Sequence, residues 1–287
     1  MSDLELSRAE RLDQRVVSQF PELSRMYATK LVEDGNVTVN GKVITKGGHK
    51  LWETDVVKVD YNPEEAAAIP DIELPILYED DDCVVINKPL GLLTHSKGVF
   101  NPEATVATWL SSRLKGLAGD RDGIVHRLDR ATSGVMICAK NPEALSALQK
   151  QFSQRRTKKT YVAIVRGRLK APEAVIDMPI ERNPKKPQTF RVGSNGKPAT
   201  TAYKVLKTTE HYSLVELKPF TGRTHQLRVH LEELGHPIVG DVLYDGPVAD
   251  RLFLHARELE ITIPSRERKV FETPVPSSFE EFLSRDR

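Results

Sequence analysis

The chain has 287 residues, 39% of them hydrophobic and 29% charged, which is typical of a soluble globular protein with one large and one small domain. No apolar run is long enough to cross a bilayer, and the acidic start, Met1 to Glu5, predicts no secretory signal. Cys83 and Cys138 lie in apolar runs, so we expect buried packing residues in a reducing, cytoplasmic compartment. No cluster has metal-ligand spacing and no nucleotide-binding loop is present, so we expect neither metal nor cofactor.

Charge is unevenly distributed along the chain although the net charge is only +2. Residues 1–60 carry 9 basic and 10 acidic residues, residues 61–82 carry 8 acidic and no basic ones, and residues 83–287 carry 33 basic and 22 acidic ones. Lys150 to Lys170 contains 8 basic residues and no acidic one. Such a run can neutralise phosphates, but an ordinary solvated face has the same composition, so charge alone leaves nucleic-acid binding open.

Residues 11–60 have the pattern of a small helix-and-hairpin domain. Apolar residues at helical spacing predict helices over Arg11–Phe20 and Ser24–Asp34, the second begun by Ser24 and closed by Gly35. Asn40-Gly41 predicts a tight hairpin between strands at 37–39 and 42–44, and residues 55–60 alternate as a last strand.

This order resembles the S4 RNA-binding domain. The matching pieces are Arg11-Leu12-Asp13, Ser24-Arg25, Leu31 to Gly35, Val37 to Gly41 and Asp55. The resemblance implies that the second helix and its neighbouring loop face RNA, which would place Arg25, Lys30, Lys42 and Lys46 near phosphates. A helix-and-hairpin module without a ligand is the alternative, since a fold does not fix a function.

Residues 61–76 are acidic and contain Pro63, Pro70 and Pro75, which predicts an extended linker. From residue 77 to 285 we expect a larger domain in which strands and helices alternate. Strands are predicted at 84–86, 135–139, 161–165, 201–206, 213–217 and 252–263, and helices at 105–117, 142–154 and 223–234. This mixture is typical of an α+β fold.

The segment His126 to Gly134 places the carboxylate of Asp129 between Arg127 and Arg130, directly before an apolar strand. If the segment is extended, Arg127 and Asp129 share a face. A carboxylate held against a fixed positive charge stays ionised and is suited to act as a nucleophile or base. An ion pair at the end of a core strand has the same pattern, so these residues alone do not decide between the two.

Four motifs in one order resemble those of the RluA family of pseudouridine synthases, over about Leu77 to Leu283. They are Asn87 to Leu92, His126 to Gly134, Lys159 to Gly167, and Thr221 to Leu231 with Gly235 to Asp241. The resemblance implies a mixed, largely antiparallel central sheet crossed by a catalytic cleft. It also implies isomerisation of uridine to pseudouridine, in which the glycosidic bond is cut, the uracil rotates and a carbon–carbon bond forms.

The resemblance assigns roles to five residues. Asp129 aligns with the catalytic aspartate and Tyr161 with a tyrosine that packs on the uracil. Arg228 aligns with the arginine that pairs with the aspartate, although Arg223 lies nearby and competes for that role. Arg127 aligns with a residue that fills the space left by a flipped base, and Leu227 with an apolar residue of the pocket. None of these assignments involves a histidine, so we expect His126, His225 and His230 to be structural.

The expected function is therefore an RNA pseudouridine synthase that acts as a monomer on ribosomal RNA of the large subunit, where S4-bearing relatives mostly act. Two alternatives come from other classes. A non-catalytic RNA-binding protein on a decayed scaffold is opposed by the intact Asp129, Tyr161 and Arg228. A glycoside or nucleoside hydrolase would need a second carboxylate, for which only Asp122 is near in sequence.

Overall fold

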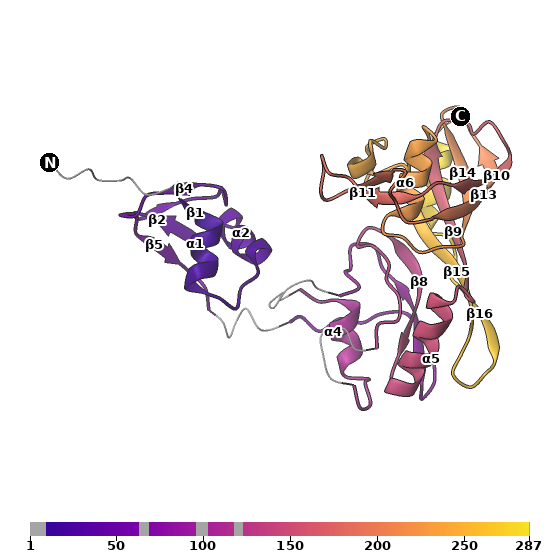
Figure 1. Cartoon of the computed structure of the whole chain (residues 1–287), viewed down its shortest axis with the longest axis horizontal. Helices are drawn as coiled ribbons and strands as arrows, with labels where there is room; N and C mark the ends of the chain where they lie inside the picture. The colour runs from indigo at the N-terminus through magenta and orange to yellow at the C-terminus, as the bar shows by residue number, and fades with distance from the viewer. Residues whose placement is uncertain (1–9, 63–68, 96–102, 118–122, 287) are drawn as a thin grey trace. The chain divides into compact units, whose positions relative to one another are not determined.

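The computed structural model describes residues 10–62, 69–95, 103–117 and 123–286. They form two compact units, one within residues 1–71 and 96–104, the other comprising residues 72–95 and 105–287 (Figure 1). Residues 1–9, part of the predicted linker (residues 63–68) and Asp122 lie outside the described residues. Within the described ranges, no helix combines the length and apolar content needed to cross a membrane.

The first unit has its own small core. Its elements are β1 (Glu10–Arg11), α1 (Leu12–Gln19), α2 (Arg25–Glu33), β2 (Val37–Val39), β3 (Lys42–Val43), β4 (Lys50–Leu51) and β5 (Val57–Val59). As predicted, the Ser24 side chain caps α2 by accepting from the Tyr27 amide at 3.2 Å. Asn40 and Gly41 have φ of 50° and 80°, the left-handed turn that joins β2 to β3. Leu12, Val16 and the apolar face of α2 pack on β2 and β5, so this unit is held together by its own apolar contacts.

The second unit is built on one large sheet. Its elements are β6 (Ile76–Glu79), β7 (Cys83–Lys88), α4 (Val106–Ser111), β8 (Ser133–Ala139), α5 (Pro142–Ser153), β9 (Lys158–Arg166), β10 (Glu173–Asp177), β11 (Ile180–Arg182), β12 (Phe190–Val192), β13 (Thr200–Thr208), β14 (Tyr212–Pro219), α6 (Gln226–Glu233), η1 (Val242–Tyr244), β15 (Leu254–Thr262), β16 (Arg268–Glu272) and α7 (Ser277–Ser284). Among the described strands the sheet order is β10-β13-β14-β9-β15-β8-β7-β6, with β16 also pairing with β15. Of the pairings between these described strands, only β15–β8 is parallel, which confirms the predicted mixed, largely antiparallel α+β fold.

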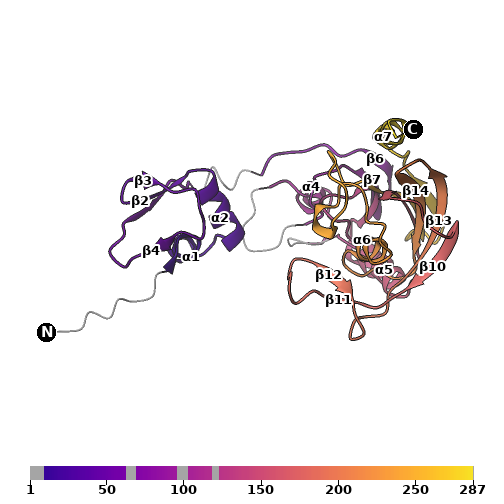
Figure 2. The same cartoon turned by 90° about the horizontal axis from the view of Figure 1, so that it is seen from above.

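Helices cover both faces of this sheet, and alternate strand residues contact different helices (Figure 2). In β9, Ala163 and Val165 belong to the cluster that includes α6, whereas Val162 and Ile164 pack with α7. Alternate residues of β7 and β8 likewise contact α4 or α5. Tyr161 belongs to both the α4 and the α6 clusters, so it lies where these two layers meet over the middle of the sheet.

Gly134 is the residue that lets the segment His126 to Gly134 join the sheet. It has φ of +121°, and a Cβ atom there would lie 2.1 Å from the carbonyl oxygen of Ala256. Only glycine allows β8 to approach β15 this closely while adopting that backbone conformation. The segment that ends at Gly134 is thereby fixed beside the central strands.

The predicted helix over 105–117 is shorter than expected. Thr105 caps α4 with a reciprocal capping box, but the helix ends at Ser111. The chain then leaves the helix because the Lys115 amide donates to the Lys140 carbonyl at 2.6 Å, at the end of β8. Pairing with that strand end replaces the last predicted turns of helix.

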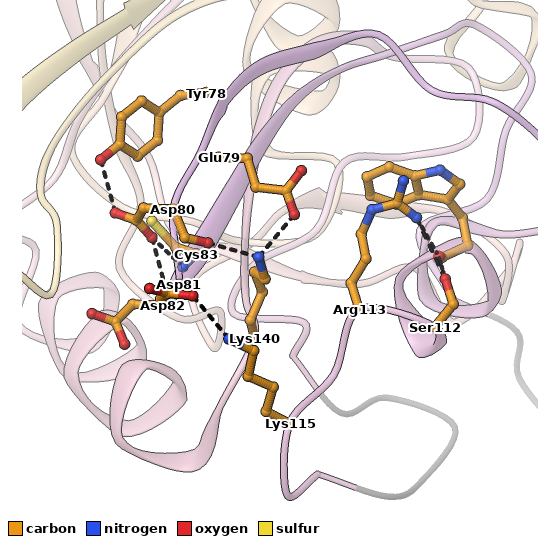
Figure 3. Close-up of polar contacts among 11 residues, drawn as sticks. Tyr78, Glu79, Asp80, Asp81, Asp82, Cys83, Ser112, Arg113, Lys115 and Lys140 are labelled. Carbon is orange, nitrogen blue, oxygen red and sulfur yellow. Dashed lines mark hydrogen bonds and ion pairs between the residues drawn. The ribbon is translucent and has the colours of Figure 1, made fainter.

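The turn between β6 and β7 neutralises part of the acidic stretch found in the sequence (Figure 3). The Asp80 carboxylate accepts from the Tyr78 hydroxyl at 2.8 Å and from the Cys83 amide at 2.7 Å, and the Tyr78 contact raises the pKa of that phenol to about 12. Lys140 donates to the Glu79 carboxylate at 2.8 Å and to the Asp80 carbonyl at 2.7 Å. These acidic residues therefore belong to the folded edge of the sheet rather than to a repelling linker.

Candidate active site

The loop before β8 is anchored by the turn after β7. The Thr94 hydroxyl donates to the Leu128 carbonyl at 2.8 Å and accepts from the Leu128 amide at 3.2 Å. The Gly91 amide donates to the Arg130 carbonyl at 2.9 Å. The buried Lys88 ammonium donates to the carbonyls of Pro89 and Leu92 at 2.9 and 2.8 Å. Asp129 therefore lies in a loop whose backbone is fixed on both sides, not in an extended strand as one hypothesis required.

Two side chains approach Asp129: Arg228 in α6, and His225, which directly precedes that helix. Arg228 Nη1 lies 3.5 Å and His225 Nε2 lies 3.8 Å from Asp129 Oδ2, while a quarter of the Asp129 side chain remains exposed. Arg228 is itself held by Asp241, to which its Nε and Nη2 donate at 2.7 and 2.6 Å. Arg127 is exposed and lines the same cleft as Asp129, so both side chains named by the sequence hypothesis lie at this site.

Arg228 is buried against Asp241 and still keeps its positive charge. Burial by itself lowers the pKa of Arg228, but the hydrogen bonds and charge of Asp241, with the charge of Asp129, outweigh it and leave the pKa above its ordinary value. Breaking such a buried pair costs about 3–5 kcal/mol, since one charge is left without its partner. Arg228 therefore keeps a permanent positive charge beside Asp129.

A cleft of about 750 Å³ opens over Asp129. Its described lining contains one carboxylate, that of Asp129, and five cations: Arg127, Arg155, Lys159, Arg223 and Arg228. A polyanion would be attracted to such a lining. Two carboxylates flanking a bond, the arrangement that glycoside hydrolysis requires, are absent from this part of the described structure.

Tyr161 and Leu227 line the same cleft and supply its apolar surface. Burial, reinforced by the charge of Asp129, raises the pKa of Tyr161, so the phenol stays neutral at physiological pH. Leu227 is almost fully buried at 6% exposure and packs in the α6 cluster with Tyr161 beside it. A planar base entering the cleft would find an aromatic ring and an aliphatic side chain near the carboxylate.

Two of the three histidines are structural, as predicted. The Ile137 amide donates to His126 Nε2 at 3.1 Å and the ring stacks on Phe152, while burial and the charge of Lys159 lower the pKa of His126 to about 3. His230 is buried and spans between Thr201 and the Met178 carbonyl, at 3.0 Å from each. His225 differs, because its Nε2 lies 3.8 Å from the carboxylate of Asp129.

Arg223 is an alternative that the sequence left open, and Lys159 is a cleft residue that the sequence prediction did not name. Arg223 Nε donates to the Pro198 carbonyl at 3.1 Å, so Arg228 is the arginine in contact with Asp129. Lys159 lines the cleft, and burial lowers its pKa to about 8. Its position two residues before Tyr161 on one strand places it on the same face, a signal that the sequence did contain.

Asp241 and Tyr244 are the functional neighbours that the sequence did not indicate. Asp241 is fully buried behind Arg228, and the guanidinium of Arg228 lies 4.9 Å from the centre of the Tyr244 ring. Both come from one short turn that leads into η1. Only the presence of Asp241 at the end of the last family motif could have pointed to this turn.

The candidate RNA-binding residues of the first unit are all exposed: Arg25, Lys30, Lys42 and Lys46. Arg25 is partly engaged, with its Nε 3.2 Å from the carboxylate of Asp13. Among the described residues, no group of three or more His, Cys, Asp or Glu side chains could hold a metal ion.

Comparison with known sequence families gives two matches. A sequence profile of RNA pseudouridylate synthases matches residues 82–233, and a profile of S4 domains matches residues 10–57. An uncharacterized RNA pseudouridine synthase of Aquifex aeolicus is 42% identical over 82% of this chain and 77% of its own length. The ribosomal large subunit pseudouridine synthase D of Borreliella burgdorferi is 37% identical over 96% of this chain and 89% of its own length.

A solved structure agrees with these sequence matches. The human RNA pseudouridylate synthase domain containing 1 superposes with a TM-score of 0.59 at 34% identity, covering 70% of this chain and 83% of that one. The site described above lies within the stretch matched by the first profile, apart from Asp241 and Tyr244, which follow it.

Proposed function

Because the chain belongs to the RNA pseudouridylate synthase family and carries an S4 domain, we propose that it isomerises uridines in large-subunit ribosomal RNA with Asp129 as the catalytic carboxylate. One observation carries the assignment of the residue: Asp129 is the sole carboxylate among the described residues that line a cleft rich in cations. Relatives named ribosomal large subunit pseudouridine synthase D align over 96% of the chain, including its first unit, which supports the choice of substrate.

The geometry suits a nucleotide that has left its stack. Base flipping costs a few kcal/mol, and a base that stacks on an aromatic side chain regains about 1–3 kcal/mol. In our proposal the uracil packs on Tyr161 and Leu227, and the exposed Arg127 fills the space that the base vacates. Arg228 places a fixed positive charge 3.5 Å from Asp129 and aims the carboxylate at the nucleotide, so that it can serve as nucleophile or base while the uracil is detached and turned.

The two units divide the work in this proposal. Residues 11–60 form the RNA-binding domain, with Arg25, Lys30, Lys42 and Lys46 on phosphates, residues 61–76 the linker, and residues 77–285 the catalytic domain. Each unit has its own apolar core, which supports separate folding. We place the enzyme in the cytoplasm, where ribosomal RNA is found, and propose that it acts as a monomer.

Mapping pseudouridines in total RNA tests this function directly. RNA from cells that lack the protein should miss one or a few pseudouridines of the large-subunit RNA. Wild-type protein should restore them, whereas Asp129→Asn at equal abundance should not. A map that does not change when the protein is absent, or full restoration by Asp129→Asn, would contradict the proposal.

A further inference from the structure

His225 has an unusual backbone for its position directly before α6. Its φ of 55° and ψ of 19° place it in the left-handed region, which is uncommon for residues other than glycine, although Asn, Asp and His adopt it more often than the rest. The side chain of Gln226 enforces this turn, since its Oε1 accepts from the Thr221 hydroxyl at 2.7 Å and from the Arg223 amide at 3.0 Å. A strained residue kept in place by its neighbours is a mark of a functional position.

The hydrogen bonds around Tyr244 determine which nitrogen of the His225 ring carries the proton. The Phe190 amide donates to the Tyr244 hydroxyl oxygen at 2.9 Å, and this amide can only donate. Tyr244 is buried, and His225 Nδ1, 2.7 Å away, is the acceptor that the described structure offers its hydroxyl proton. With Nδ1 accepting, the ring proton lies on Nε2. Nε2 is the atom that faces Asp129 at 3.8 Å.

We propose that His225 is a positioning residue for Asp129, a neutral imidazole whose Nε2–H is aimed at the carboxylate by Tyr244 and by the backbone of β12. This inference deepens the proposed function and rests on it. Burial lowers the pKa of His225, which keeps the ring uncharged and is consistent with this role. The ring is fixed further by edge contacts with Phe190 and Tyr244, each at 5.6 Å between centroids.

The turn from Asp241 to Tyr244 therefore orients both partners of the carboxylate. Asp241 fixes Arg228 and Tyr244 fixes His225, so the two groups that approach Asp129 Oδ2 share one support. Two fixed neighbours limit the movement of a carboxylate more strictly than one. Misplacing a reacting group by about 1 Å can cost a hundredfold in rate, which sets the scale of the expected effect.

Two substitutions at position 225 distinguish the role of Nδ1, which contacts Tyr244, from that of Nε2, which faces Asp129. Asn offers an oxygen near the position of Nδ1 and has no donor at the position of Nε2, whereas Gln extends an amide N–H toward that position. Single-turnover assays should show that His225→Asn lowers the rate constant for pseudouridine formation by about tenfold to a hundredfold with RNA affinity unchanged. His225→Gln should recover part of the rate.

Tyr244→Phe removes the hydroxyl that holds His225 Nδ1 and leaves the side chains of His225 and Asp129 unchanged. It should lower the single-turnover rate in the same direction, whereas Tyr203→Phe should not. Tyr203 is a matched control, because its hydroxyl donates to the Ala171 carbonyl and lies outside the cleft lining.

The tautomer can be read independently of activity in protein labelled with 15N-histidine. Long-range proton–nitrogen spectra should show the proton of His225 on Nε2, with the signal identified by its loss in His225→Asn. A proton on Nδ1, or a wild-type rate in His225→Asn, would overturn the inference. If Asp129→Asn were fully active, the proposed function would fail instead, whatever the tautomer of His225.

Discussion

Arg228 lies beside Asp129 but is bound more tightly by a second carboxylate, that of Asp241. Arg228 gives both of its shortest hydrogen bonds to the buried Asp241 and approaches Asp129 only at 3.5 Å. Asp129 therefore lies beside a fixed positive charge without being held in a tight bidentate bond, as a reacting carboxylate would require under the proposed function. The same arrangement explains why the arginine must be rigid, since a lysine could not serve two carboxylates in fixed directions.

Tyr161 should contribute through its ring more than through its hydroxyl. Tyr161→Phe keeps the aromatic surface, so we expect a modest loss of rate, whereas Tyr161→Ala removes a stacking contact worth about 1–3 kcal/mol, roughly five- to 150-fold. Single-turnover kinetics on an RNA substrate check this order. Equal wild-type rates in both variants would mean that Tyr161 is only a core residue, and melting temperatures serve as the control for folding.

Lys159 should make RNA binding sensitive to pH. Burial lowers its pKa to about 8, so the ammonium in the cleft loses its proton as pH rises through that value. If the ammonium contacts a phosphate, the KM for RNA should rise several-fold between pH 7 and pH 9. Lys159→Met should show a higher KM at pH 7 and a flatter profile, because the titrating charge is gone.

The control for this profile is Lys158→Met. Lys158 is the preceding residue of β9, and its exposed ammonium pairs with Glu260 instead of lining the cleft. A profile as steep in Lys159→Met as in the wild type would assign the pH dependence to another group.

At the scale of elements, the sequence predicted those helices and strands whose signals lie within the segment itself, such as caps, turn residues and apolar runs. The two helices and the hairpin of the first unit carry their own caps and turn residues, such as Ser24 and Asn40-Gly41, and all of them are present. Strands β7, β8, β9, β13, β14 and β15 were indicated by apolar runs or alternation and lie in the sheet. Their boundaries differ by a few residues, as hydrogen bonding rather than hydrophobicity decides where a strand ends.

The elements that were missed depend on tertiary contacts. The two-residue strands β1 and β4 exist because they pair with each other, and the charged β10 because it pairs with β13. By contrast, the five residues named from the motifs all line one cleft: Arg127, Asp129, Tyr161, Leu227 and Arg228. The supporting turn at 241–244 could not be foreseen, since its role lies in packing behind Arg228.

Directly after helix α7, Asp286 joins Thr209 and His211 in a group of hydrogen bonds, called the latch below. Asp286 accepts from the Thr209 hydroxyl at 2.6 Å and from the amide and Nδ1 of His211 at 2.8 Å each. We expect Asp286→Asn to increase hydrogen exchange in α7 at pH 6 without changing activity. Lys207→Met, which removes an exposed pair with Glu280, is the matched control and should have a smaller effect.

The latch should also depend on pH in a definite direction. Hydrogen bonding to Asp286 raises the pKa of His211, so its charge contribution is present at low pH and is lost as pH rises through the raised value. Hydrogen bonds from Thr209 and His211 lower the pKa of Asp286 to about 2, so its contribution is lost only in strong acid. The difference in α7 protection between wild type and Asp286→Asn should therefore shrink from pH 6 to pH 8. A constant difference would show that the charge of His211 is irrelevant.

At the scale of the whole molecule, the first unit should act on affinity rather than on chemistry. All residues of the cleft belong to the second unit, so deleting residues 1–70 should leave the single-turnover rate at saturating RNA nearly unchanged. The KM on long structured RNA should rise and its salt dependence should become shallower, because fewer phosphates are neutralised. A short substrate should show little difference between the two forms.

A full-length variant shows how much of the rise in KM comes from the lost cations of the first unit and how much from loss of the whole unit. Replacing Lys30, Lys42 and Lys46 by Gln should reproduce part of the rise in KM and of the change in salt slope. Residues 1–60 carry slightly more acidic than basic residues, so binding must depend on where the cations lie rather than on their sum. An unchanged KM and salt slope after deletion would mean that the first unit does not bind this RNA.

The central claim is that the carboxylate of Asp129 performs the isomerisation within a cleft that binds RNA. The most direct measurement is pseudouridine formation by purified Asp129→Asn in a single turnover on a fragment of large-subunit ribosomal RNA, with the dissociation constant and melting temperature measured in parallel. Asn keeps the size and most hydrogen-bond capacity of Asp but cannot ionise. We predict no detectable pseudouridine, with binding and stability close to those of the wild type. Turnover by this variant at a rate near that of the wild type would contradict the account.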